Sequence, residues 1–345
     1  FQRLESKTKL PLALGKGVGG EAVVADLQSM PHLLIAGATG SGKTVCLNSI
    51  ISCLLIHDSP EHLKLILIDP KRVELVPFNP VPHLISPVIV EKEKALGALR
   101  WLNQEMDNRY KRLESAGAKN IESYNRSQDK PIPYIVLIID ELADLMMWSS
   151  DEVERLICRL AQLARATGIH IIIATQRPSV DVVTGLIKAN FPARIAFAVP
   201  SQFDSRTILD TGGAEKLLGG GDMLYMPPDV SRPMRLQGCF VSEEEIERLT
   251  NFWGNQGLEQ RLREEVAREI TQQVVSPDDP LLERARQLAK EHKHLSTSFL
   301  QRKLSIGYPR AAKLMDLLEG EGLVSSGEPG RSREVIKEVS EDGPQ

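Results

Sequence analysis

Apolar and polar positions follow two alternating patterns through the first part of the chain. Short runs rich in leucine, isoleucine and valine predict buried parallel strands, because a strand covered on both faces has no polar side. These runs span 33–36, 63–68, 134–139, 170–174 and 194–198. The longer segments between them, including 43–56, 93–115 and 151–166, have helical patterns. We therefore predict an α/β fold in which helices cover both faces of a central, mostly parallel sheet.

Flanking segments extend this prediction toward both ends of the sheet. Residues 1–30 are expected to be a β-rich lead-in to a main domain at 31–270. Near the end of that domain, the patterns at 221–226 and 235–241 predict a hairpin whose strands are separated by a proline-rich turn. The hairpin is expected to close the core.

A second, smaller domain is predicted at the C-terminus. The polar, turn-rich residues 271–279 are expected to link it to the main domain. Residues 280–337 contain three helical patterns, a glycine turn and two short apolar segments around a second turn, which predicts a winged helix. The helices are expected at 281–291, 297–303 and 309–319. Residues 338–345 form an acidic tail.

Composition and charge fit this division. The chain has 345 residues, of which 42% are apolar and 26% charged, as is typical of soluble proteins with two or three domains. The formal net charge is −4, yet residues 280–337 carry 11 Lys and Arg against 7 Asp and Glu. A small basic domain therefore follows a mildly acidic one, and local positive potential of this kind favours nucleic-acid binding.

The spacing of the cysteines and the length of the apolar runs indicate the cellular compartment of the chain. Cys46, Cys53, Cys158 and Cys239 lie far apart without a C-x-x-C pair, so neither a zinc site nor a disulfide framework is predicted. No apolar run of the sequence has the length needed to cross a bilayer. We expect a soluble, cytoplasmic fragment without membrane contact. The chain begins with Phe1, which indicates a piece of a longer protein.

The segment 37–44, with the sequence GATGSGKT, joins the first predicted strand to the helix at 43–56. It has the pattern of a P-loop in the strand–loop–helix context that the motif requires. Its glycines let backbone N–H groups surround phosphates, and the helix N-terminus adds positive potential. Lys43 is expected to reach the β- and γ-phosphates and Thr44 to bind Mg²⁺. The predicted contacts to a nucleoside triphosphate are Gly37, Ala38, Thr39, Gly40, Ser41, Gly42, Lys43, Thr44 and Val45.

Polar residues at two later strand ends complete a hydrolytic site. The strand at 134–139 ends in Asp140 and Glu141. Asp140 is expected to hold Mg²⁺ through its water shell, and Glu141 to orient the attacking water or accept its proton. At the end of the next strand, Gln176 can sense the γ-phosphate. The alternatives are that the acids only cap the following helix and that Thr175 and Gln176 are a satisfied strand-end pair.

Beyond these motifs, an ordered set of segments resembles the cytoplasmic motor of FtsK/SpoIIIE-type bacterial double-stranded DNA translocases. The matching segments are 37–44, 69–71 (DPK), 139–141 (IDE), 163–170 (LARATGIH), 174–182 (ATQRPSVDV) and 204–210 (DSRTILD). The segment 306–312 (IGYPRAA) resembles the γ domain of the family, a winged helix that reads short oriented chromosomal sequences. The resemblance covers nearly the whole chain and implies a RecA-like P-loop NTPase core followed by a small winged-helix domain.

The resemblance implies a homohexameric ring that uses ATP to pump double-stranded DNA through its channel during chromosome segregation and cell division or sporulation. ATP would lie at each subunit interface. Arg165 resembles the arginine finger that enters the neighbouring site and stabilises the charge of the phosphoryl-transfer transition state. The alternative is that Arg165 only complements the dipole at a helix end.

Several basic residues match positions that face the channel in this family. Arg177, Lys188 and Arg206 would contact DNA phosphates, which gives a grip that is independent of sequence and sensitive to salt. Lys216 is the only cation of the glycine-rich loop at 210–222, which suits a segment that changes shape with the nucleotide. The alternatives are that these basic residues are solvated surface charges and that the loop at 210–222 is purely structural.

In the small domain, Arg310 and Lys313 fall outside the apolar stripe of the third helix, and Arg310 is expected to read guanine. Arg331 and Arg333 at the wing tip would contact the minor groove or phosphates. Pro309 stands where relatives often carry Asn, so no base contact is assigned to it. A sequence-blind basic face or a protein-docking surface is the alternative. The resemblance also implies a site-specific recombinase as a partner, and the cytoplasmic face of the inner membrane for the full-length protein.

Other classes of function share parts of this pattern. A small-molecule kinase also has a P-loop and Mg²⁺, but the acidic pair and the winged helix argue against it. A non-motor DNA-binding protein in which ATP switches assembly would also carry a winged helix. A conjugative coupling or secretion ATPase shares the core, but such proteins generally lack a γ-like reader.

Overall fold

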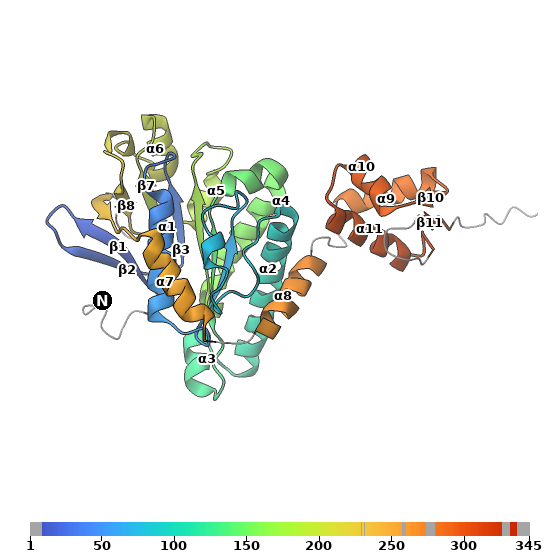
Figure 1. Cartoon of the computed structure of the whole chain (residues 1–345), viewed down its shortest axis with the longest axis horizontal. Helices are drawn as coiled ribbons and strands as arrows, with labels where there is room; N and C mark the ends of the chain where they lie inside the picture. The colour runs from blue at the N-terminus through green and yellow to red at the C-terminus, as the bar shows by residue number, and fades with distance from the viewer. Residues whose placement is uncertain are drawn as a thin grey trace, which may run out of the picture.

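The leucine-, isoleucine- and valine-rich runs form the centre of a nine-stranded sheet in the computed structural model, which describes residues 9–228, 230, 232–256, 260–273, 280–325 and 332–336. The runs form β3 (His32–Ala36), β4 (Leu63–Ile68), β5 (Tyr134–Ile139), β6 (Ile169–Thr175) and β7 (Ala193–Phe197). They pair in parallel in the order β7-β3-β6-β5-β4. The predicted α/β fold around parallel strands is confirmed (Figure 1).

Antiparallel strands extend the sheet beyond β7. From β7 outward they are β8 (Asp222–Met226), β9 (Met234–Gly238), β1 (Pro11–Gly17) and β2 (Ala22–Asp26). The β8–β9 pair is the predicted hairpin. In the pairing of β1 with β9, a Cβ atom on Gly15 would lie 2.0 Å from the carbonyl oxygen of Gln237, so only glycine fits there. The N-terminal lead-in is therefore part of the main sheet.

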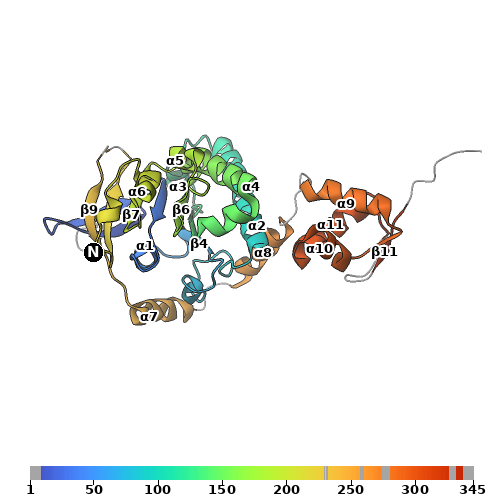
Figure 2. The same ribbon diagram turned by 90° about the horizontal axis from the view of Figure 1, so that it is seen from above.

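Helices cover both faces of the sheet, because successive strand residues point to opposite sides. Leu33 and Ile35 of β3 share one apolar core with α1 (Lys43–His57). Leu34 and Ala36 share the other core with α2 (Lys92–Ser115) and α4 (Leu142–Leu163). Figure 2 shows α1 and α7 (Glu243–Gly254) on one side of the strands and α2 and α4 on the other.

Helix α4 begins well before the helix predicted at 151–166. It starts directly after β5, and Glu141 is its N-cap residue, with a carboxylate that accepts the N–H of Ala143 at 3.3 Å. The backbone leaves the helical conformation at Ser149 and resumes it afterwards. This break interrupts the periodic pattern, which explains why the sequence indicated only the second half of the helix. A 3₁₀ turn, η2 (Ala164–Thr167), follows α4.

Shorter elements complete the main domain. They are η1 (Val76–Phe78), α3 (Ile121–Ser127), α5 (Gly185–Asn190), α6 (Gln202–Leu209), η3 (Ala214–Lys216) and α8 (Gln260–Gln272). Helix α8 packs on α2, where the indole N–H of Trp101 donates to the Glu269 carboxylate at 2.8 Å. None of the helices in the described part of the chain has the length and hydropathy that would let it span a membrane.

The C-terminal domain has a core of its own. Its elements are α9 (Pro280–Glu291), β10 (His294–Leu295), α10 (Thr297–Leu304), α11 (Tyr308–Gly320) and β11 (Arg333–Glu334). Leu282, Leu300 and Leu314, one from each helix, pack together with Val324, which bridges to Val335. Three helices with a small antiparallel sheet form the predicted winged helix. Of the linker predicted at 271–279, the first two residues belong to α8. Residues 274–279, residues 326–331, where the wing turn was predicted, and the predicted acidic tail at 338–345 lie outside the described residues.

Candidate functional site

The P-loop connects β3 to α1 at the carboxyl edge of the parallel strands. Gly40 and Gly42 have φ angles of 76° and 114°, which favour glycine. Contacts impose glycine as well: a Cβ atom on Gly37 would lie 2.5 Å from the Cβ of Phe197, and one on Gly42 would lie 2.8 Å from the Cα of Gly221. Gly42 is the N-cap of α1 and has no side chain to occupy the first N–H groups of the helix, so these donors are available to an anion.

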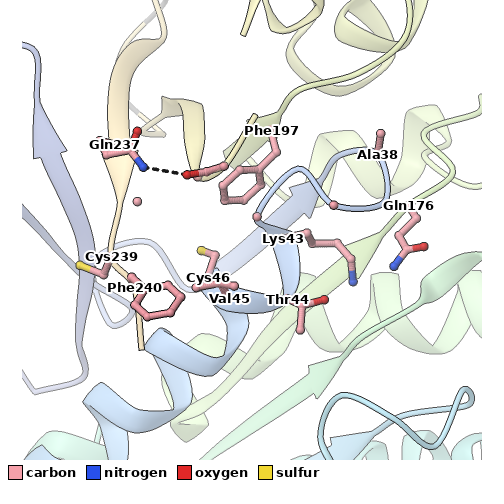
Figure 3. Close-up of a pocket in the computed structure, with 15 residues that line it drawn as sticks. Ala38, Lys43, Thr44, Val45, Cys46, Gln176, Phe197, Gln237, Cys239 and Phe240 are labelled. Atoms are coloured by element: carbon pink, nitrogen blue, oxygen red, sulfur yellow. Dashed lines mark hydrogen bonds between the residues drawn. The ribbon is translucent and has the colours of Figure 1, made fainter. Parts of the chain in front are cut away.

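A cavity of about 370 Å³ lies beside the P-loop. Its lining comes from the P-loop and the start of α1, from Gln176 and Phe197, and from the residues around the end of β9, including Gln237, Cys239 and Phe240 (Figure 3). A polar, glycine-rich wall therefore faces an apolar one. Ligand cavities of this size commonly combine an apolar surface with a few polar groups, and this pair of walls fits the phosphates and the base of a nucleotide.

Lys43 and Asp140 form a buried ion pair at the floor of the site. The Lys43 Nζ lies 2.6 Å from Oδ1 of Asp140 and 2.8 Å from its backbone oxygen, and the two side chains are only 2% and 0% exposed. The second carboxylate oxygen of Asp140, Oδ2, is buried without a hydrogen-bond partner among the described residues. An unpaired, buried carboxylate oxygen on the partner of Lys43, the residue that precedes the hydroxyl-bearing Thr44, fits a hydrated Mg²⁺.

Glu141 is also buried, and its carboxylate is held from several sides. It accepts hydrogen bonds from the Thr175 hydroxyl at 2.6 Å, the Gln176 backbone N–H at 3.1 Å and the Lys71 ammonium at 3.1 Å. The Gln176 side-chain oxygen in turn accepts from the Thr39 hydroxyl of the P-loop at 3.0 Å. Because β5 and β6 are neighbouring parallel strands, their ends bring these residues together.

Lys71 was not assigned a role from the sequence. It follows β4, the strand next to β5, so its segment ends at the same edge of the sheet as Asp140 and Glu141. The signal that could have found it is the polar residue pair Asp69 and Lys71 directly after a buried strand.

Arg165 lies at the other end of the sheet. It is in η2, before the start of β6, whereas Gln176 follows the end of that strand. The seven residues of β6 span roughly 23 Å at roughly 3.3 Å per residue. This is longer than any side chain, so Arg165 cannot reach the P-loop of its own subunit.

The predicted DNA contacts of the main domain differ in their surroundings. Arg177, Arg206 and Lys216 are exposed. The Lys188 ammonium is instead paired with Asp210 at 2.7 Å, and the same carboxylate pairs with Arg194 at 2.6 Å. These two partners lower the pKa of Asp210 against the opposing effect of its burial. Lys188 therefore holds the end of α6 in place in addition to any role toward DNA.

The glycine-rich loop at 210–222 contacts the P-loop through its backbone. The N–H of Gly221 donates to the carbonyl of Ser41 at 3.0 Å, and the N–H of Gly238 donates to the carbonyl of Gly221 at 2.8 Å. Gly219, Gly220 and Gly221 all have positive φ angles. The loop that carries Lys216 is thus bonded directly to the nucleotide-binding segment.

In the small domain, the structure corrects one predicted DNA contact. Arg333 is buried, with 8% exposure, and its guanidinium pairs with Glu319 and, at 3.7 Å, with Asp316 of α11. Because both acids belong to α11, the Arg333 guanidinium holds β11 to this helix rather than extending toward DNA. Arg331 lies outside the described residues.

The two predicted readers on α11 are half-buried. The guanidinium carbon of Arg310 lies 5.7 Å from the ring centroid of Trp148 in α4, within the range of a cation–π contact. Lys313 lies one turn further along the same helix.

Two family profiles match the sequence. The FtsK/SpoIIIE family profile matches residues 2–180, and the Ftsk gamma domain profile matches residues 276–338. Curated relatives include the DNA translocase FtsK of Clostridium acetobutylicum, 53% identical over 96% of this chain, and the DNA translocase SpoIIIE of Bacillus subtilis, 49% identical over 96%. This chain covers 44% of the length of each of these two relatives.

Solved structures agree on the fold. The pCW3 conjugation coupling protein TcpA, solved with ATPγS, superposes with a TM-score of 0.63 at 28% identity, covering 72% of this chain and 71% of that protein. The cytoplasmic domain of the type VII secretion ATPase EccC of Thermomonospora curvata has a TM-score of 0.65 at 23% identity, covering 74% and 32%. With the sequence matches, the site geometry and the winged helix taken together, the chain belongs to the FtsK/SpoIIIE family.

Proposed function

We propose that this chain is the motor and DNA-reading part of an ATP-driven double-stranded DNA translocase that acts in bacterial chromosome segregation, division or sporulation. The observation that carries the proposal is the combination, in one chain, of a P-loop beside the buried acids Asp140 and Glu141 with a winged helix that matches the gamma domain. The named relatives are DNA translocases, and the chain spans less than half of their length.

The residues of the site support hydrolysis of ATP. Thr44 and Asp140 would hold Mg²⁺, which neutralises phosphate charge when bound. Lys43 leaves its ion pair with Asp140 for the β- and γ-phosphates. Glu141 orients the attacking water and accepts its proton, and Gln176 contacts the γ-phosphate from the next strand.

Arg165 acts in trans in this proposal. Its distance from the P-loop of the same subunit leaves only a neighbouring site within reach. A groove of about 640 Å³ surrounds it, lined by Tyr110, Gln28 and Lys119 among others, and can receive part of an adjacent subunit. A closed homohexameric ring supplies one such neighbour to every site.

Duplex DNA would pass through the ring and contact exposed cations. Arg177 and Arg206 supply phosphate contacts, and Lys216 moves with the loop that is bonded to the P-loop. The winged helix would read short oriented chromosomal motifs through Arg310 and Lys313, and it offers a surface to a site-specific recombinase. In the full-length protein these domains would lie at the cytoplasmic face of the inner membrane.

ATP turnover measured with and without linear duplex DNA tests the proposal. We expect stimulation by DNA, and loss of turnover in Lys43→Ala and in Asp140→Ala while Arg310-dependent DNA binding is kept. Turnover that ignores DNA would reject the motor, and phosphorylation of a small metabolite would indicate a kinase.

A conjugative coupling ATPase is the second candidate, because TcpA shares the main domain at 28% identity. Displacement of a DNA-bound roadblock separates the two. A translocase with a reader should show a direction bias on DNA that carries oriented motifs, and Arg310→Ala should remove the bias without stopping the motor. Absence of any bias in the wild-type chain would favour the coupling ATPase.

A further inference from the structure

The loop after β4 is built to hold Lys71 in a defined place. Asp69, at the end of this strand, is fully buried and accepts four backbone hydrogen bonds from the loop that follows. Its Oδ1 accepts the N–H groups of Lys71 at 3.1 Å and Arg72 at 3.0 Å. Its Oδ2 accepts those of Glu74 at 2.9 Å and Leu75 at 3.0 Å. The backbone that carries Lys71 is therefore fixed to the sheet edge.

The Lys71 ammonium bridges two groups of the proposed hydrolytic site. It lies 3.1 Å from Glu141 Oε2 and 3.1 Å from the side-chain oxygen of Gln176. These residues come from the ends of β5 and β6, so Lys71 ties three neighbouring strand ends together. The lysine side chain is 36% exposed while that of Glu141 is 2% exposed. A cation at the rim of the site thus fixes a carboxylate inside it.

We infer that Lys71 is a positioning residue for ATP hydrolysis, which holds the Glu141 carboxylate and the Gln176 amide in the geometry that the attacking water requires. The inference rests on the proposed ATPase function. Removal of the ammonium leaves Glu141 Oε2 with the Gln176 N–H as its remaining described donor, while Oε1 keeps the Thr175 hydroxyl. It also removes the cation that Oε2 shares with the Gln176 side-chain oxygen, so the two acceptors are no longer held together. Misplacement of a catalytic group by about 1 Å can reduce the rate on the order of 100-fold.

The role of Lys71 differs from that of Lys43. Lys43 lies in the P-loop, where it meets phosphate, whereas the described partners of Lys71 are the groups that would handle water. A loss at Lys71 should therefore appear in kcat rather than in nucleotide affinity.

The test compares Lys71→Met, Lys71→Arg and the matched control Arg72→Met, which removes a positive charge from the next position of the same loop. DNA-stimulated ATP turnover gives kcat and KM, and a fluorescent ATP analogue gives nucleotide affinity. For Lys71→Met we expect kcat to fall on the order of 10-fold to 100-fold with affinity changed by about twofold or less. Lys71→Arg should recover much of the lost rate, and Arg72→Met should behave like wild type. Circular dichroism melting confirms that each variant is folded.

Other outcomes overturn the inference. Lys71→Met with a kcat within about threefold of wild type would show that Glu141 does not depend on it. Parallel loss of nucleotide affinity and turnover would make Lys71 a phosphate contact, and an equal loss of kcat in Arg72→Met would show that the charge of the loop, rather than the bridge from Lys71 to Glu141, supports turnover. Failure of the proposed function is distinct, because the wild-type chain itself would then lack DNA-stimulated turnover.

Discussion

Lowering the pH from about 7.5 to about 5 should destabilise the main domain, because three of its histidines are buried as neutral rings. His32, His83 and His170 are at most 1% exposed. Burial, together with the nearby His170, lowers the pKa of His32 from 6.5 to about 3. Burial likewise lowers the pKa values of His83 and His170 to about 4. In the unfolded chain each ring takes up a proton near its ordinary pKa.

The magnitude follows from these values. The folded pKa values are depressed, so this contribution to stability is fully present above pH 6.5 and is lost as the pH falls from there toward the folded values of about 3 and about 4. A pH of about 5 lies about 1.5 units below the unfolded pKa, so protonation of each histidine stabilises the unfolded state by about 2 kcal/mol. Together the three histidines remove roughly 6 kcal/mol, a large part of the stability of a typical domain.

Urea unfolding followed by tryptophan fluorescence measures this loss. Trp101, Trp148 and Trp253 are the three tryptophans of the sequence and all lie in the main domain, so the signal reports mainly on that domain. The informative variant is His32→Leu, because neither ring nitrogen of His32 has a hydrogen-bond partner within the part of the chain that the structure describes. Between about pH 7.5 and about pH 5, the free energy of unfolding of His32→Leu should fall by about 2 kcal/mol less than that of the wild-type chain.

The control is His62→Leu, which removes a histidine whose side chain is exposed. It should show the same acid destabilisation as wild type. The reasoning is refuted if His32→Leu loses as much stability as wild type on acidification, because burial of the neutral ring would then not be the cause.

Three further changes test the proposed site and the small domain. Mixing Arg165→Ala subunits with Lys43→Ala subunits should restore part of the ATP turnover that each lacks alone, because a mixed interface can join an intact P-loop to an intact arginine. Arg333→Ala should lower the free energy of unfolding of the winged helix by about 2 kcal/mol, as measured by calorimetry. The substitution removes the partner of Glu319 and of Asp316, which is half exposed. Gly221→Ala should weaken nucleotide binding on the order of tenfold in a fluorescence titration, because φ is 95° and the new Cβ would lie 2.8 Å from the Gln237 amide.

Each of these changes has a matched control. Mixed rings verified by mass that show no turnover would reject the trans role of Arg165. Lys313→Ala removes a cation from the same domain and should leave its melting temperature nearly unchanged, so equal losses in both variants would contradict the role of Arg333. Gly220→Ala imposes a similar left-handed strain in open space, where no atom lies within 4 Å of the new Cβ. Equal effects at both glycines would show that the close approach of the new Cβ to the Gln237 amide is unimportant.

Local signals were sufficient for the parallel core and the P-loop. Buried parallel strands are apolar on both faces, so runs such as 63–68 and 134–139 stand out and match β4 and β5 to the residue. The P-loop is recognisable because its glycines are required by the local backbone conformation: Gly40 and Gly42 have positive φ angles, which other residues rarely adopt. Strand ends in a parallel sheet share one edge, which places Asp140 beside Lys43.

Features that depend on distant partners were not predictable in the same way. The bridge from Lys71 to Glu141 joins residues 70 positions apart, and nothing in the local sequence indicates its length or direction. Arg333 was predicted as a DNA contact because an arginine beside a turn is commonly exposed. Its inward orientation depends on the acids of α11, and these become neighbours only after the winged helix has folded.

The contact between Gly221 and the P-loop has a mechanical consequence. Where two segments meet through side chains, rotamer changes can absorb a small displacement, but here backbone meets backbone, and Gly221 is bonded to Ser41 on one side and to Gly238 on the other. A shift of the P-loop must therefore either break a hydrogen bond or displace the loop that carries Lys216. Displacement of the phosphate-binding backbone is thereby coupled to the loop that carries Lys216 through main-chain hydrogen bonds, which a side-chain substitution cannot remove.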